Sequence, residues 1–298
     1  MRLVARVALV TTYPPSVLDP TWLRLVDDAA IFPPGDAPLH EATAAFSARR
    51  EEWYAGFVGS FVLRDTDLPL VRGFGGPVSV VVTGGAGQVA GPVALARRLG
   101  LDLAGIEIAL RDPDDLPGNA RRVVAAVDEV RGELVKELGG EVPVHIELPQ
   151  VEPTAGWLAA ADVIAAAELR LKFRTGGTEA DAFPSAPVLA TWIDAALDRE
   201  TPFKCTAGLH GALRHRDPET GFEHHGFLNV LVATRHAFDG ASRDDVVAVL
   251  EQRDKATLVG LAFDTELSGA RRWFTSFGSC SINEPLDDLV GTGLLEDV

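Results

Sequence analysis

Lysine is rare in this sequence, yet two lysines stand inside apolar, strand-like stretches. The 298 residues include 27 lysines and arginines, and only four of these are lysines: Lys136, Lys172, Lys204 and Lys255. Lys172 lies in the stretch LRLKF and Lys204 in PFKCT. Lysine, unlike arginine, readily becomes a neutral amine when it is removed from water. This usage indicates that Lys172 and Lys204 have a chemical role.

Other polar residues interrupt apolar stretches in the same way, often two positions apart. They are Glu107 in GIEIAL, His145 and Glu147 in VHIEL, Arg174 after Lys172, Thr206 after Lys204, and Ser276 with Ser279 near the last strand-like stretch. Residues two apart on a strand share a face. We therefore expect one polar surface, on which Glu107 and Glu147 pair with Lys172, Arg174 and Lys204, and Arg170 to face a helix layer. The alternative is an ion-pair network that only fills the interior.

Short strand-like stretches alternate with longer helical patterns along the whole chain. The expected strands are 28–32, 60–63, 78–83, 105–110, 144–148, 169–173, 202–206 and 273–277. The expected helices are 38–54, 89–99, 119–138, 154–167, 185–197, 244–252 and 285–295. Eight strands alternating with helices predict an α/β fold of the (β/α)8 TIM-barrel type.

Residues 222–238 add an element, helical or strand-like, between the seventh and eighth strands. The alternative fold is a doubly wound open sheet, but no glycine-rich phosphate fingerprint follows the first strand. Without an internal repeat or a linker, we expect residues 1–298 to form a single barrel domain.

In such a barrel, charged residues are tolerated mainly at the carboxyl-terminal mouth, where barrel enzymes place their active sites. Arg174 lies at this rim, and Thr175, Gly176 and Gly177 follow in a loop whose N–H groups could hold an anion. The simpler reading of the loop is a turn into the next helix. The Ser/Gly-rich turn around Ser279 and Cys280 could likewise bind an anion or be an ordinary loop. Asp27 or Asp28 could add a carboxylate to the site, and the alternative is that one of them only caps or pairs with an arginine.

These residues together fit imine chemistry. A lysine close to another cation in a water-poor lumen is expected to have a lowered pKa. Its neutral amine could attack a carbonyl group, with Glu147 or His145 as general base. Arg174 could bind a carboxylate or phosphate of the same substrate.

Two sequence blocks resemble a known family. KFRTGG at 172–177 and KCTAGLH at 204–210, whose lysines are 32 residues apart, are similar to blocks of deoxyribose-phosphate aldolase and related class I aldolases. The resemblance covers residues 169–211 and implies that Lys172 forms the Schiff base, that Lys204 lowers its pKa, and that glycine loops hold phosphate. The blocks also resemble those of an uncharacterised bacterial protein family.

The sequence departs from the aldolase pattern at three points. Arg174 replaces a small residue, AGLHGALRH follows the seventh strand in place of the phosphate loop, and the proton-relay aspartate has no counterpart that we can place. Glu107, His145 and Glu147 occupy similar strands. The resemblance therefore predicts a fold and a site, and the expected activity is a lyase or aldolase acting on a keto acid or sugar phosphate.

Two other functions remain open. His210, His215, His224 and His225 fall within sixteen residues and could bind a metal in a metal-dependent lyase or hydrolase, although their spacing matches no strict ligand motif. His210 is also a candidate acid, base or phosphate donor near the mouth. A barrel that binds a small anion without catalysis would keep Arg174 and the glycine loop but would not need a neutral lysine.

The overall composition limits the partners. A net charge of −16 argues against nucleic acid, which requires a basic face. Two cysteines, Cys205 and Cys280, give no disulfide scaffold. Cys205 lies between Lys204 and Thr206 and is expected to face outward, packed as a small hydrophobe. No stretch is long and apolar enough to span a membrane. The short apolar run in MRLVARVALVTTYPP lacks a small-residue cleavage site. We expect a cytoplasmic enzyme without a cofactor, and homo-oligomerisation stays open.

Overall fold

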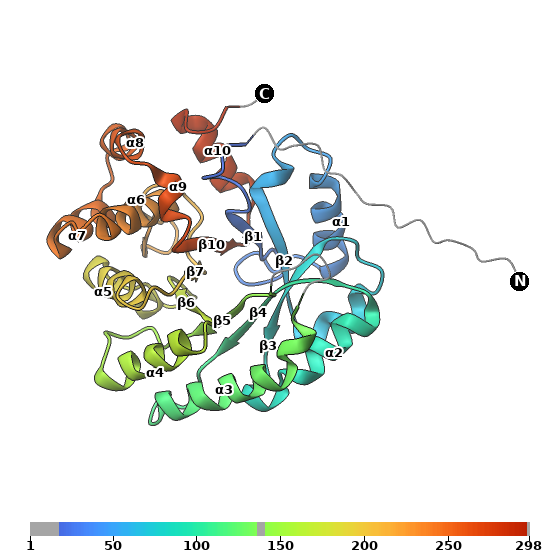
Figure 1. Cartoon of the computed structure of the whole chain (residues 1–298). Helices are drawn as coiled ribbons and strands as arrows, with labels where there is room; N and C mark the ends of the chain where they lie inside the picture. The colour runs from blue at the N-terminus through green and yellow to red at the C-terminus, as the bar shows by residue number, and fades with distance from the viewer. Residues whose placement is uncertain (1–17, 136–140, 297–298) are drawn as a thin grey trace, which may run out of the picture.

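The fold is a closed barrel of parallel strands surrounded by helices (Figure 1). The computed structural model describes residues 18–135 and 141–296. The barrel strands are β1 (Val26–Asp28), β2 (Val58–Arg64), β3 (Pro77–Val82), β4 (Asp102–Ala109), β5 (Val144–Glu147), β6 (Arg170–Arg174), β7 (Phe203–Thr206) and β10 (Phe274–Ser279). Their order β1–β2–β3–β4–β5–β6–β7–β10 closes by parallel pairing of β10 with β1. The predicted (β/α)8 barrel is confirmed.

Helices cover the outside of this barrel. They are α1 (Leu39–Arg49), α2 (Ala90–Leu99), α3 (Leu116–Val130), α4 (Ala155–Ala166), α5 (Ala186–Leu197), α6 (Phe227–Phe238), α7 (Arg243–Glu251), α8 (Lys255–Asp264), α9 (Leu267–Ala270) and α10 (Asn283–Thr292). Side-chain caps start several of them: Thr154 accepts a hydrogen bond from the Trp157 amide and Ser185 from the Val188 amide. None of the described helices is long and apolar enough to cross a bilayer.

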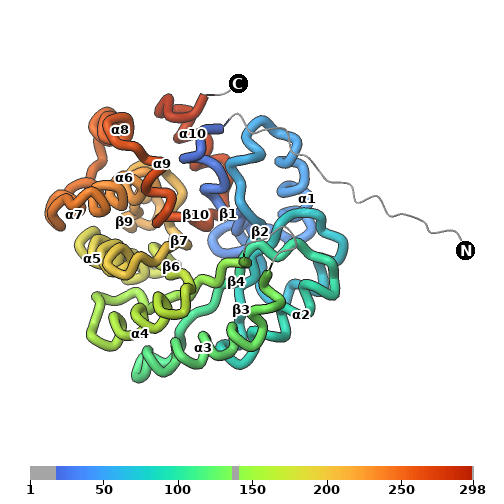
Figure 2. Tube along the Cα trace, in the orientation of Figure 1, coloured from blue at the N-terminus to red at the C-terminus, as the bar shows by residue number. Residues whose placement is uncertain are grey.

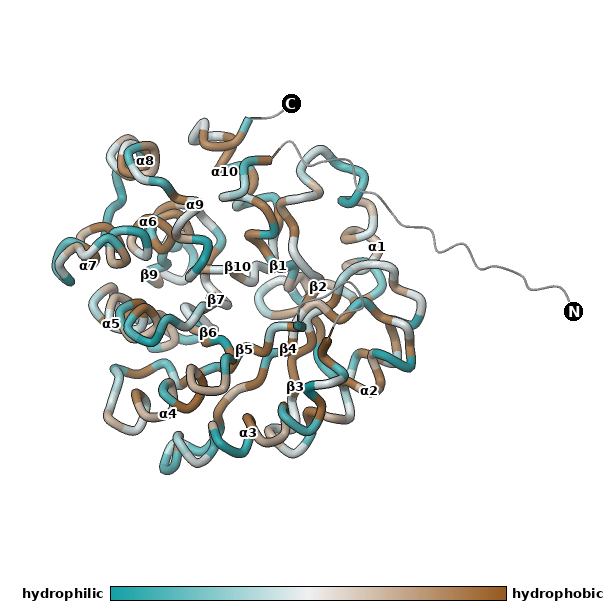
Figure 3. Tube along the Cα trace, viewed as in Figure 1, coloured by the Kyte–Doolittle hydropathy of each residue, from teal (hydrophilic) through white to brown (hydrophobic). Residues whose placement is uncertain are grey.

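The main hydrophobic core lies between strands and helices. Phe173 on β6 packs against Trp157 of α4, Trp192 of α5 and Phe203 of β7, with ring centroids 5.0–6.3 Å apart. Cys205 is fully buried on this outer face of β7, as predicted from its position beside Lys204. Figure 3 shows hydrophobic stretches along strands β2, β3 and β4, with mixed colours on the surrounding helices. Because the odd-numbered residues of β6 fill this layer, Lys172 is left to face the lumen.

The two ends of the described chain meet at one side of the barrel. Figure 2 shows the red helix α10 beside the blue segment that leads into β1. The indole Nε1 of Trp22 donates a 3.0 Å hydrogen bond to the Leu294 carbonyl oxygen. This contact joins the segment before β1 to the segment after α10.

Several element boundaries differ from the predictions. The first strand ends at Asp28 instead of beginning there, and residues 29–35 form turns that contain Pro33 and Pro34, which cannot donate ladder hydrogen bonds. The helix predicted at 119–138 begins at Leu116, because Asp115 caps it and Pro117 fits its first turn. That helix ends at Val130, while residues 136–138 and the stretch MRLVARVALVTTYPP lie outside the described residues.

The insertion between the seventh and eighth barrel strands is larger than predicted. It contains a small antiparallel hairpin of β8 (His215–Arg216) and β9 (Glu223–His224), followed by α6 to α9. The predicted element at 222–238 corresponds to β9 and α6, and the helix at 244–252 corresponds to α7. The helices α8 and α9 were not predicted.

Candidate functional site

Strands β6 and β7 place the two unusual lysines side by side. Lys172 and Lys204 are register partners on these adjacent parallel strands, and both side chains are almost completely buried. Their aliphatic stems and charged ends lie within the barrel, since their neighbours Phe173 and Cys205 occupy the outer layer. The prediction that the lysines share one lumen-facing surface is confirmed by their contacts with a common carboxylate.

Glu107 on β4 is the centre of this surface. Its Oε2 lies 2.7 Å from Lys172 Nζ, and its Oε1 lies 2.7 Å from Lys204 Nζ. Glu147 on β5 binds Lys172 at 2.9 Å, while Asp27 on β1 binds Lys204 at 2.6 Å. The five side chains form a continuous chain of ion pairs across the lumen, which we call the lysine network: Asp27, Lys204, Glu107, Lys172 and Glu147.

Asp27 is fixed by serine hydroxyls as well as by Lys204. Its Oδ1 accepts hydrogen bonds from the backbone N–H and the Oγ of Ser60, and its Oδ2 accepts one of 2.8 Å from Ser276 Oγ. Ser60 in turn contacts Ser79 Oγ at 2.7 Å. Ser60 and Ser79 were missed by the sequence analysis. Their only signal was a serine within each of the apolar stretches SFVL and VSVVV.

The lysine network holds both lysines in their charged forms. Burial opposes the charge on Lys172, but Glu107 and Glu147 outweigh it and raise its pKa above the usual value. Burial likewise opposes the charge on Lys204, and Asp27 and Glu107 raise its pKa. Despite its burial, Glu107 has a pKa well below the usual range because of the two ammonium groups. The expected lowered pKa of Lys172 is therefore wrong, because the two carboxylates bound to Lys172 outweigh the effect of its burial.

His145 lies beside the network without a hydrogen-bond partner among the described residues. Both ring nitrogens are buried. Burial, followed by the charge of Lys204, lowers the pKa of His145 well below its usual value, so the ring is neutral. Arg170, the register neighbour of His145, also contributes to this shift. Arg170 lies two residues before Lys172 and shares its strand face, so the expectation that it faces the helix layer is wrong.

The rim beyond Lys172 consists of Arg174 and a tightly packed loop. Arg174 has no side-chain hydrogen bond or ion pair with the described residues. Thr175 is fully buried, and its hydroxyl donates a 2.6 Å hydrogen bond to the Ala207 carbonyl oxygen. A Cβ on Gly176 would lie 2.8 Å from Gly208 Cα, so glycine allows the two loops to touch. The TGG sequence therefore has a packing role at this rim, where Gly177 is partly exposed.

The remaining predicted residues lie around the same mouth. Thr206 ends β7 and is partly exposed, Ser276 binds Asp27, and the Ser279 hydroxyl donates to the Ser281 carbonyl oxygen at 2.6 Å. Asp28 is buried against Arg49 at 2.7 Å, which is the arginine pairing considered as its alternative role.

The four clustered histidines do not converge on one point. His210 contacts Glu284 at 3.1 Å and Cys280, whereas His215 stacks on His224 across the hairpin with centroids 5.2 Å apart. His225 is buried, and its Nε2 lies 2.8 Å from the Pro184 carbonyl oxygen. Among residues 18–135 and 141–296, no group of three or more His, Cys, Asp or Glu side chains is arranged to hold a metal ion. His215 and His224 are therefore partners across the β8–β9 hairpin, and His225 is buried directly after it.

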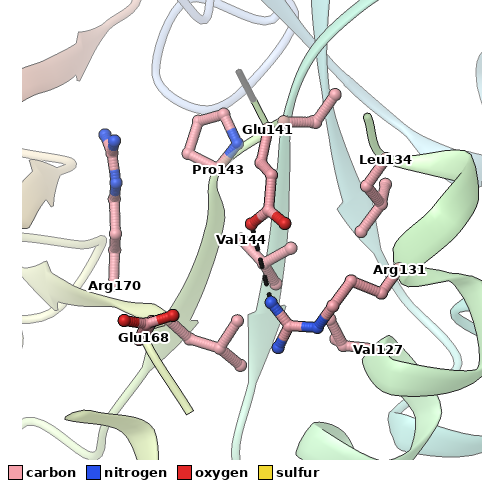
Figure 4. Close-up of a pocket in the computed structure, with 10 residues that line it drawn as sticks. Val127, Arg131, Leu134, Glu141, Pro143, Val144, Glu168 and Arg170 are labelled. Atoms are coloured by element: carbon pink, nitrogen blue, oxygen red, sulfur yellow. Dashed lines mark ion pairs between the residues drawn. The ribbon is translucent and has the colours of Figure 1, made fainter. Parts of the chain in front are cut away.

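A separate cavity lies at the opposite end of the barrel. It has a volume of about 150 Å³ and is bounded by residues at the amino ends of β5 and β6, among them Val144, Glu168 and Arg170. Figure 4 shows the Arg131–Glu141 ion pair, 3.5 Å long, at one side of it. None of the network carboxylates lines this cavity. This cavity is therefore separate from the lysine network.

Comparison with known proteins gave no family: no protein-family model and no curated protein matched the chain. The similarity of its KFRTGG and KCTAGLH blocks to class I aldolases stays a hypothesis.

Proposed function

We propose that this protein is an imine-forming lyase of the aldolase type that acts on a small anionic carbonyl compound, with Lys172 as the nucleophile. The observation that carries the proposal is the position of Lys172, buried between Glu107 and Glu147 on β6. This strand ends in Arg174, whose side chain has no hydrogen bond or ion pair among residues 18–135 and 141–296. The Glu147 side chain is 18% exposed, whereas that of Glu107 is 3% exposed. Lys172 therefore has a neighbour that reaches the mouth, and Lys204 is enclosed.

The raised pKa of Lys172 keeps its amine protonated, so the reaction needs a neighbouring base that takes this proton. Transfer of one proton from Lys172 Nζ to Glu147 across their 2.9 Å contact converts an ion pair into two neutral groups without changing the net charge. A buried site tolerates this exchange more readily than loss of a proton to solvent, because it leaves no uncompensated carboxylate. The neutral amine can then attack the carbonyl carbon, and the protonated Glu147 can act as the acid that releases water.

The other residues of the network have supporting roles in this proposal. Glu107 and Lys204 keep the charge around Lys172 balanced, and Asp27 with its serine donors holds Lys204 in place. Arg174 supplies a guanidinium group for a carboxylate or phosphate of the substrate, which favours an anionic carbonyl compound. A keto acid or a sugar phosphate meets these requirements.

Borohydride trapping tests the proposal directly. The protein is incubated with glyoxylate, pyruvate, glyceraldehyde 3-phosphate or neutral glycolaldehyde, reduced, and examined by intact mass and peptide mapping. We expect a covalent adduct on Lys172 that is lost in Lys172→Arg and kept in Lys255→Arg, whose lysine lies outside the barrel strands. We expect Arg174→Met to weaken trapping of the anionic compounds more than that of glycolaldehyde.

The outcome separates the proposed enzyme from a binding protein. Absence of any adduct on Lys172 with all four compounds would overturn the imine mechanism. If the anionic compounds still bind in calorimetry and Lys172→Arg leaves that binding intact, the barrel is a non-catalytic anion-binding protein, and its lysine network has only a structural role.

A further inference from the structure

A cysteine, a histidine and a glutamate come together at the mouth, outside the lysine network. Cys280 Sγ follows the end of β10 and lies 3.8 Å from Nε2 and 3.9 Å from Nδ1 of His210, in the loop after β7. Nδ1 of His210 lies 3.1 Å from Glu284 Oε2 near the start of α10. His210 and Cys280 lie in two loops that are 70 positions apart in the chain, so the barrel closure brings them together.

The contacts assign different tasks to the two ring nitrogens. When Nδ1 donates its proton to Glu284, Nε2 carries the free lone pair and lies 3.8 Å from the sulfur. The carboxylate then stabilises the ring whenever Nε2 becomes protonated. The sulfur lies almost equally far from both nitrogens, so a small rotation of the thiol or the ring aligns it with Nε2. Such contacts often tighten only when a substrate is bound.

The surroundings keep the thiol protonated until it is used. Burial, followed by the charge of Glu284, raises the pKa of Cys280, while backbone hydrogen bonds from Gly35 and from Cys280 itself act in the opposite direction. Cys280 is nevertheless partly exposed, and the His210 side chain is 18% exposed. A protonated thiol beside an available imidazole fits a nucleophile activated by a general base, and it does not fit a permanent thiolate.

We propose that Cys280, His210 and Glu284 form a second nucleophilic site, which adds reversibly to the carbonyl carbon of a small aldehyde. His210 Nε2 removes the thiol proton, the sulfur forms a bond to the carbonyl carbon, and the carbonyl electron pair moves to oxygen. That oxygen then takes the proton from Nε2, which gives a thiohemiacetal. Reversal of these steps releases the aldehyde, and no oxidant or further reactant is needed.

The choice of an aldehyde rests on the proposed function, because a carbonyl compound that reaches Lys172 must enter through the mouth where Cys280 lies. The site would hold the aldehyde substrate or product of that reaction near the barrel. The existence of an activated thiol at Cys280 can be measured separately from the imine.

Iodoacetamide labelling of the full-length protein, followed by peptide mass mapping, tests the activation. We expect Cys280 to be alkylated while the buried Cys205 is not, which gives an internal control in every sample. His210→Phe, which keeps a ring of similar shape, should slow the alkylation of Cys280 by about 10-fold or more. Glu284→Gln should slow it less. An unchanged rate in His210→Phe, with the fold verified by circular dichroism, would overturn the proposal.

Glyoxylate tests the aldehyde chemistry. We expect it to protect Cys280 from iodoacetamide in the wild type and in Lys172→Arg, at concentrations at which it does not protect free N-acetylcysteine. Carbon-13 glyoxylate should show a thiohemiacetal resonance that is absent in Cys280→Ser. Trapping at Lys172 without protection of Cys280 would overturn this inference and leave the proposed function intact. Protection of Cys280 without trapping at Lys172 would support this inference and overturn the proposed function.

Discussion

Lys172 and Lys204 bind opposite oxygens of the same carboxylate, that of Glu107, at 2.7 Å each. Each lysine also has a carboxylate of its own, Glu147 for Lys172 and Asp27 for Lys204. Three carboxylates thus surround two ammonium groups, and the balance explains why both lysines are charged despite their burial. Because Glu107 is shared, the charge state of one lysine depends on the charge state of the other.

The first prediction concerns Glu107. Glu107→Gln removes the charge that both lysines share, and we expect it to lower the free energy of unfolding by about 3 kcal/mol, measured with urea. Each lysine keeps one carboxylate, so the protein should still fold. Glu133→Gln is the matched control, because Glu133 pairs with Arg97 at 3.1 Å on the surface and should change stability by less than about 1 kcal/mol. Equal effects of the two changes would contradict a buried network.

The barrel itself could be predicted because each strand carries a local signal. Apolar stretches bounded by turns located seven of the eight barrel strands, and lumen-facing polar residues stood out by their period of two. The first strand was displaced because Ala29 to Phe32 look apolar, whereas these residues follow β1 in turns that lead to Pro33 and Pro34. Helices α8 and α9 were missed within the insertion after β7.

The electrostatics of the site could not be read from the sequence. The pKa of Lys172 depends on whether the group nearest to its ammonium is a cation or a carboxylate. The register of the neighbouring strands decides this, because it places Glu107 between the two lysines. The sequence favoured a lysine with a lowered pKa, and the packing produced the opposite shift. The contact of Cys280 with His210 depends in the same way on closure of the barrel.

The second prediction tests the coupling of Lys204 with Asp27. Lys204→Met leaves two carboxylates without their buried cation and should reduce the free energy of unfolding by about 3–5 kcal/mol. Adding Asp27→Asn removes one of these charges while keeping oxygen and nitrogen atoms for Ser60 and Ser276. The double variant should therefore be more stable than the sum of the single changes predicts, by about 1–3 kcal/mol in a double-mutant cycle. Simple additivity would show that the pair is not coupled.

The third prediction concerns the contact between the two rim loops. Gly176→Ala places a Cβ 2.8 Å from Gly208 Cα and 2.8 Å from Phe183 Cε1, and the backbone contact cannot be relieved by a rotamer change. We expect a loss of about 1–3 kcal/mol in thermal or urea unfolding. Gly260→Ala serves as the control, since a Cβ there meets no atom within 4 Å and lies within helix α8, where alanine should stabilise by about 0.5–1 kcal/mol. Similar losses at both positions would exclude the loop contact as the cause.

The last prediction follows from His225, the buried histidine behind the hairpin. Burial, followed by the charge of Arg214, lowers its pKa to about 4, compared with about 6.5 in the unfolded chain. The unfolded state therefore binds more protons between these values, so stability is complete above about pH 6.5 and declines as the pH falls toward 4. His225→Gln removes this group, and the loss of stability between pH 7.5 and 5 should become smaller by about 2 kcal/mol. His40, with a side chain 83% exposed, provides the control His40→Gln, which should leave the pH profile unchanged. Urea unfolding at a series of pH values measures both, and a profile of His225→Gln that matches the wild type would show that His225 can be protonated without opening its burial site.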